Sequence, residues 1–95
     1  MKLIRDDLDI EIDHSRLGFA NPEQYKFLLI QKLEEEIQEL KDSNFEDPNE
    51  YGDVIEVIYA LAEEFVKGGV PTIEDARILK LLNLGGFKNG LVLLK

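Results

Sequence analysis

Apolar residues recur at spacings of three and four along residues 22–41. They are Leu29, Ile30, Leu33, Ile37 and Leu40. At about 100° per residue these positions form one stripe, which is typical of an amphipathic helix that packs against a neighbour. Asn21, Pro22 and Gln24 provide a cap, a first-turn proline and the third-position partner of a capping box. The pattern therefore predicts a helix over about 22–41.

A second helical pattern covers residues 48–67 and is apolar over a wider arc. Its apolar positions are Tyr51, Val54, Ile55, Val57, Ile58, Leu61, Ala62 and Phe65. They span roughly 200°, whereas one neighbour needs only about 100°. This helix is therefore expected to pack on two surfaces, which favours a homodimer or homotetramer. Gly52 is unfavourable inside a helix, and it suggests the close approach of a neighbouring backbone or ligand.

The two ends of the chain have weaker patterns. Leu8, Ile10 and Ile12 alternate with acidic residues, which fits either an extended lead or a short helix. Near the C-terminus, residues 91–94 form an apolar tail that fits either a strand or an arm packed on a partner subunit. Both alternatives stay open at each end.

Glycines and a proline divide the second helix from a third. Gly68 and Gly69 are expected to end the second helix through a left-handed cap, and Pro71 to start a shorter third helix with Thr72 as its cap. The predicted fold is an all-α antiparallel helical bundle of two long helices and a shorter third. It forms a single domain over 1–95 and is completed by oligomerisation.

Four carboxylates stand out at helical spacing. Glu36 and Glu39 are three apart on the first long helix, and Glu50 and Asp53 are three apart on the second. Residues three apart share a helix face, so packed antiparallel helices would gather all four. Uncompensated carboxylates repel one another, and hard divalent cations take carboxylate oxygens as ligands. The spacing predicts a site for Mg²⁺, with Mn²⁺ as a possible substitute.

The charge distribution narrows the class of partner. Residues 22–67 hold 13 Asp and Glu against 4 Lys and Arg, so the whole net charge of −9 lies on the two long helices. This argues against binding a nucleic acid polymer through a broad basic surface. The sequence has no cysteine and no long apolar run. We therefore expect no thiolate metal site and no membrane partner, and we expect a cytoplasmic location.

The same residues resemble a known superfamily. The segment Lys32-Leu33-x-Glu35-Glu36-x-x-Glu39, followed by Glu50-x-x-Asp53, is similar to the ExxE and ExxD motifs of the MazG-like and phosphoribosyl-ATP-pyrophosphatase-like nucleotide pyrophosphohydrolases. The opening Lys-Leu-x-Arg-Asp at 2–6 and Gly-Gly-Phe-x-x-Gly at 85–90 resemble a short-chain branch. Asp7 stands where that branch usually has lysine.

The resemblance implies a role for each matching residue. Glu36, Glu39, Glu50 and Asp53 would hold magnesium, and Glu35 would orient or deprotonate the attacking water. A nucleoside triphosphate or related nucleotide would be cleaved to a nucleoside monophosphate and pyrophosphate, in the removal of unwanted nucleotides or in a phosphoribosyl-ATP reaction. Several basic residues are the candidates to offset phosphate charge: Lys2, Arg5, Arg77, Lys80 and Lys88.

Two other hypotheses compete with an enzyme. The first is a non-catalytic acidic helical oligomer that binds a partner protein through the apolar arc and tail. The second treats every acid as a solvated surface residue. Against the second, Glu50 projects within the apolar arc of its helix, near Val57. Against the first, a partner-binding module does not require acids at both Glu36 and Asp53.

Overall fold

The computed structural model describes the backbone of residues 1–95 and all side chains except those of residues 9–11. The elements, in order, are η1 (Asp6–Glu11), η2 (His14–Arg16), α1 (Pro22–Asp42), α2 (Pro48–Phe65) and α3 (Gly69–Leu84). The two η elements are 3₁₀ helices, and no part of the described backbone is a strand. The all-α prediction is confirmed.

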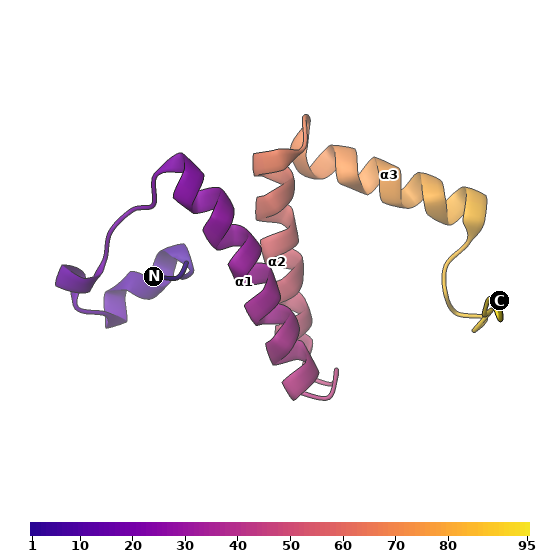
Figure 1. The fold of residues 1–95 in the computed structure, drawn as a ribbon, viewed down its shortest axis with the longest axis horizontal. Coiled ribbons are helices and arrows are strands. Elements are labelled where there is room, and N and C mark those ends of the chain that lie inside the picture. The colour runs from indigo at the N-terminus through magenta and orange to yellow at the C-terminus, as the bar shows by residue number, and fades with distance from the viewer.

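α1 and α2 form an antiparallel hairpin in the middle of the molecule (Figure 1). The Asn21 side chain accepts a hydrogen bond from the Gln24 N–H at 2.8 Å, and the Gln24 side chain accepts one from the Asn21 N–H at 3.0 Å. At α2, the Asp47 carboxylate accepts from the Asn49 N–H at 2.9 Å. These contacts satisfy free donors at each helix start, so both predicted starts are confirmed.

The N-terminal residues form 3₁₀ helices, which decides between the two alternatives in favour of a short helix. Leu8 is exposed and Ile12 is half-buried, so the period-two pattern does not build a strand with one covered face. The side chain of Ile10, the third residue of that pattern, lies outside the described part of the chain. The segment before α1 folds back toward the hairpin (Figure 1).

α3 begins earlier than the sequence pattern predicts. Its first residue is Gly69 and its N-cap is Gly68, so the prediction of a start at Pro71 with Thr72 as cap is wrong. The φ angles of Gly68 and Gly69 are +89° and +63°, values that glycine adopts without the usual steric cost. They let the chain turn sharply just after α2, which ends at Phe65 rather than near residue 67. The C-cap of α2 is Val66 in an extended conformation, so the prediction that Gly68 and Gly69 end this helix through a left-handed cap is wrong.

Glu63 contributes to the same turn, because its carboxylate accepts a hydrogen bond from the Val70 N–H at 3.0 Å. A carboxylate in this position satisfies a free donor in the first turn of α3 and is stabilised by the positive end of the helix dipole. The contact ties the last turn of α2 to the start of α3.

The chain on its own is extended. Its radius of gyration is 16.7 Å, whereas about 12 Å is expected for a compact domain of this length. The core lies between α1 and α2, at Leu28, Leu29, Val57 and Ala62. α3 projects away from the hairpin, and the residues after it form an irregular tail (Figure 1).

Apolar side chains remain uncovered along α3 and the tail. Leu79, Leu82 and Leu84 are 60%, 77% and 79% exposed. The tail at residues 91–94 is also exposed and has no regular secondary structure, so it is not a strand within the chain. Among the described residues, no helix combines the length and the apolar character that a membrane crossing requires.

Candidate metal centre

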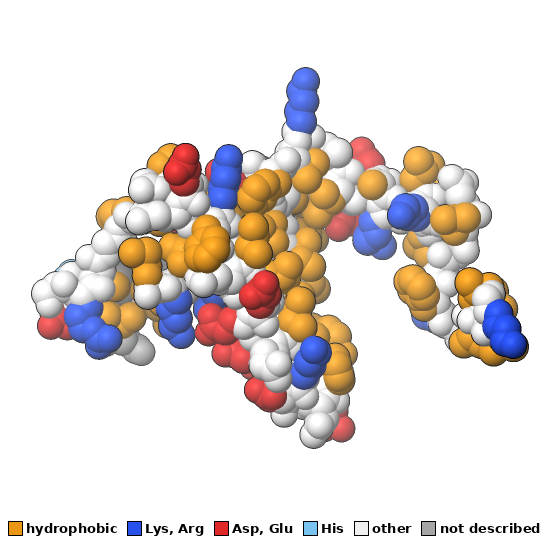
Figure 2. All heavy atoms as spheres, viewed as in Figure 1, with side chains coloured by type: hydrophobic (Ala, Val, Ile, Leu, Met, Phe, Trp, Pro, Cys, Tyr) orange, Lys and Arg blue, Asp and Glu red, His pale blue; other side chains and the backbone are white. Residues whose placement is uncertain are grey.

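The four predicted carboxylates meet at the closed end of the α1–α2 hairpin. The connection between the helices, residues 43–47, is short, so the last turns of α1 lie beside the first turns of α2. Glu36, Glu39, Glu50 and Asp53 each offer one oxygen atom, and these four atoms lie within 4.8 Å of one another. We call this set the carboxylate cluster. Figure 2 shows acidic side chains gathered along this part of the hairpin.

Two oxygens of the carboxylate cluster are buried and unpaired. Glu36 is only 5% exposed, and its Oε2 atom has no hydrogen-bond partner. Glu50 is half-buried, but its Oε2 atom is buried and also has no hydrogen-bond partner. Burying a charged oxygen without a partner is unfavourable. The arrangement would be satisfied by a cation, and an all-oxygen set is the kind that magnesium takes.

The pKa values of two members of the cluster are raised, first by burial and then by neighbouring carboxylates. Burial and the neighbouring Glu39 raise the pKa of Glu36, although Lys32 acts in the opposite direction. Burial and the charge of Asp53 raise the pKa of Glu50. In both carboxyls burial and neighbouring negative charge therefore favour the neutral form.

Two basic side chains partly compensate the cluster. Arg5 donates from Nη2 to Oδ1 of Asp53 at 2.5 Å, and this hydrogen bond raises the pKa of Arg5. Lys32 lies 3.2 Å from Oε1 of Glu36. Four carboxylates thus face two cations. The sequence analysis did not select Lys32, although its position four residues before Glu36 is the spacing that brings helix side chains together.

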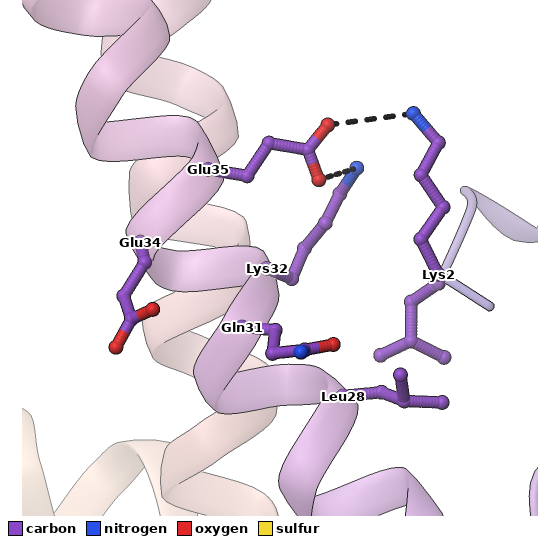
Figure 3. A pocket seen from close by; sticks show the side chains of 7 residues that line it. Lys2, Leu28, Gln31, Lys32, Glu34 and Glu35 are labelled. Carbon is purple, nitrogen blue, oxygen red and sulfur yellow. Dashed lines mark hydrogen bonds and ion pairs between the residues drawn. The ribbon is translucent and has the colours of Figure 1, made fainter.

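Glu35 lies next to the cluster but outside it. Its two oxygens contact the Nζ atoms of Lys2 and Lys32, each at 3.4 Å (Figure 3). Burial opposes ionisation, but Lys32 and Lys2 together hold the pKa of Glu35 below its usual value. Glu35 is therefore kept as a carboxylate, fixed between a helix residue and the N-terminal segment.

A cavity of about 410 Å³ opens beside this ion-paired group. It lies between the N-terminal segment and α1, and Leu3, Leu28 and Gln31 line it together with the two lysines and Glu35 (Figure 3). Glu34 lies at its border, with its side chain pointing away from Lys2 (Figure 3). Its lining on α1 runs from Leu28, about two turns before Glu36, to Glu35, so the cavity adjoins the carboxylate cluster.

The five basic residues predicted for phosphate binding separate into two groups. The structure brings Lys2 and Arg5 to the carboxylates. The other three, Arg77, Lys80 and Lys88, lie far from the carboxylates of the same chain. The reason is that α3 leaves α2 at the end opposite to the cluster (Figure 1). Asp53 and the end of α2 are about 18 Å apart at 1.5 Å per residue. Arg77 instead pairs with Glu74 at 3.0 Å.

Comparison with known proteins adds no family assignment: no family model, curated protein or solved structure matches this chain.

Proposed function

We propose that the protein is a magnesium-dependent nucleoside triphosphate pyrophosphohydrolase of the MazG-like type. The observation that carries the proposal is the convergence of four carboxylates within 4.8 Å, with buried oxygens of Glu36 and Glu50 left unpaired. Exposed acidic clusters are common without a metal, but a buried charged oxygen without a partner is not. The resemblance in motif order supports the nucleotide substrate.

The carboxylate cluster would hold the metal through Glu36, Glu39, Glu50 and Asp53. Bound magnesium supplies the positive charge that lets a polyanionic phosphate chain approach an acidic protein, and it stabilises charge during phosphoryl transfer. Lys2 and Arg5 extend from the N-terminal segment beside the cluster. Both would neutralise phosphate oxygens that the metal does not reach.

Glu35 remains the proposed group for the attacking water. Its lowered pKa keeps it ionised at neutral pH, which is the form that accepts a hydrogen bond from water. The water oxygen attacks the α-phosphorus, and the bond from that phosphorus to the α–β bridging oxygen breaks. A nucleoside monophosphate and pyrophosphate result. Glu35 orients the water, and the proton passes to solvent, because a carboxylate with a lowered pKa is a poor proton acceptor.

We also propose that a second copy of the chain completes the bundle. A chain of this size rarely exposes as much apolar surface as Leu79, Leu82 and Leu84 present. The radius of gyration, well above that of a compact domain, fits a subunit whose third helix packs elsewhere. A partner subunit would also be the source of the basic residues of α3, which do not reach the cluster within one chain.

The alternative function, a partner-binding module without catalysis, is favoured by the same exposed residues of α3 and the tail. It differs from the enzyme in what it requires of the carboxylates. A binding module would keep its partner when Asp53 is replaced, and it would not need a divalent cation.

The deciding experiment measures pyrophosphate release from a panel of ordinary and modified nucleoside triphosphates, with magnesium and with chelator. The variants are Asp53→Ala and a matched control, Asp75→Ala, which makes the same change at an exposed position of α3. We expect magnesium-dependent release by the native chain and the control, and a loss of at least about a hundredfold for Asp53→Ala.

Pyrophosphate release from no nucleotide, by a folded protein that also fails to bind magnesium in calorimetry, would refute the enzyme. If Asp53→Ala releases pyrophosphate as fast as the native chain, the carboxylate cluster is not the active site, although the protein is still a pyrophosphohydrolase.

A further inference from the structure

Two ion pairs hold the first residues of the chain beside the carboxylate cluster. Residues 1–5, which we call the N-terminal arm, precede η1 and have no regular secondary structure. Lys2 pairs with Glu35, and Arg5 pairs with Asp53. Both partners belong to the proposed catalytic machinery. The electrostatic anchors of the arm are thus the same carboxylates that a metal ion and substrate would use.

The ion pair between Arg5 and Asp53 is open to solvent. Its side chain is 56% exposed, and that of Asp53 is 32% exposed. Ion pairs with such access to water are weak, so a divalent ion in the cluster has only a small interaction to overcome. A cation bound by Asp53 also repels the guanidinium beside it. The charges of Glu56 and Glu36, which also favour the charged form of Arg5, would be partly neutralised by the same ion.

We propose that a divalent cation entering the carboxylate cluster displaces Arg5 from Asp53, and that the freed guanidinium then binds a phosphate group of the nucleotide. This rests on the proposed function, because it assigns a second position to a residue of that site. In the metal-free protein Arg5 supplies part of the missing positive charge. In the loaded protein the same side chain is free for the phosphates, to which guanidinium offers a paired set of donors.

Thermodynamic linkage makes the exchange measurable from both sides. If docking of Arg5 weakens magnesium binding by some factor, then magnesium must weaken docking of the arm by the same factor. If Arg5 instead held Asp53 in place for the metal, its removal would weaken binding. The sign of the change therefore separates a competitor from a positioning residue.

The first measurement is calorimetric titration with magnesium chloride at pH 8. We compare the native chain with Arg5→Gln and with Lys2→Gln. The second variant removes the same charge from the same arm but contacts Glu35, outside the four-carboxylate set. Arg5→Gln should tighten magnesium binding by about two- to fivefold, the range expected from losing an exposed ion pair. Lys2→Gln should change it by less than about twofold.

The second measurement follows amide hydrogen exchange over residues 1–8 of the native protein, so it does not depend on a variant folding. The Leu8 N–H donates to the Arg5 carbonyl at 3.1 Å, which gives this segment a reporter. Residues 14–17, where the Leu17 N–H donates to the His14 carbonyl, serve as the internal control. Magnesium should speed exchange in residues 1–8 only, and a non-hydrolysable nucleoside triphosphate added with it should slow exchange again.

The possible outcomes distinguish this proposal from the proposed function. Weaker magnesium binding in Arg5→Gln, equal tightening in both variants, or unchanged exchange in a protein that does bind magnesium would overturn the exchange of Arg5 and leave the metal centre intact. If faster exchange is not reversed by the nucleotide analogue, the phosphate contact is wrong. If the native chain binds no magnesium, both the proposed metal site and the proposed exchange of Arg5 are refuted.

Discussion

Replacing Glu36 by glutamine should stabilise the metal-free protein while weakening its response to magnesium. Glu36 is the most buried member of the carboxylate cluster, and its Oε2 atom has no partner. Glutamine has nearly the same shape and no charge. Its amide can also donate a hydrogen bond to a neighbouring carboxylate, which glutamate cannot do.

The size of the effect follows from the distances. Oxygens of the other three carboxylates lie within 4.8 Å, and each repulsion is at least about 0.9 kcal/mol even in a water-like dielectric. The three together reach about 2.6 kcal/mol. The attraction between Lys32 and Glu36 at 3.2 Å offsets about 1.3 kcal/mol of this repulsion in the same dielectric. The neutral side chain should therefore gain roughly 1 kcal/mol, or about 4–8 °C in Tm for a domain of this size.

The assay is thermal unfolding at pH 8, with chelator and with magnesium chloride, at one protein concentration. A metal that binds only the folded state raises Tm, so the native chain should gain more from magnesium than the variant does. Glu34→Gln is the matched control, because Glu34 is an exposed residue of α1 outside the cluster. Its effect should stay within about 0.5 kcal/mol.

The pH dependence gives a further check on the cause. The pKa of Glu36 is raised above 4.5 in the folded protein, so proton binding favours folding. The native chain should therefore be less stable to unfolding than Glu36→Gln at a pH above the raised pKa. This difference in stability should disappear as the pH falls through that pKa. A variant that melts lower than the native chain in chelator at pH 8 would refute the reasoning. It would mean that the Lys32–Glu36 pair outweighs the repulsion.

Three other outcomes are expected. Gly69→Ala should lose at least about 1 kcal/mol of stability in chemical unfolding. The φ angle of Gly69 is +63°, and the new Cβ would lie 2.5 Å from a Glu63 carboxylate oxygen. Unchanged stability would contradict this reasoning. Gly52→Ala should instead gain about 1 kcal/mol, since a Cβ there meets nothing within 4 Å in the chain, and a loss would indicate that another subunit approaches this position. Leu79→Glu combined with Leu82→Glu should shift the mass in sedimentation equilibrium toward the 10.9 kDa of one chain, and a native protein that already sediments as a single chain would refute the proposed assembly.

Local sequence signals were sufficient for the two long helices and for the choice of carboxylates. Asn21 and Asp47 start their helices through contacts with residues two or three positions away, and such contacts depend little on the rest of the fold. Glu36 with Glu39 and Glu50 with Asp53 share helix faces for the same local reason. A short connection between two amphipathic helices then leaves few ways to pack them, so the meeting of the four acids was predictable.

Contacts between distant parts of the chain were not predictable in this way. Arg5 and Asp53 are 48 residues apart, and no periodicity links them; their pairing depends on how the N-terminal segment folds back. The start of α3 was misjudged because Thr72 and Pro71 give a recognisable cap signal, while the positive φ angles of Gly68 and Gly69 and the Glu63 contact start the helix earlier. Helix starts and shared faces come from neighbouring residues, whereas counter-charges and turns depend on which remote side chains the packed chain brings within reach.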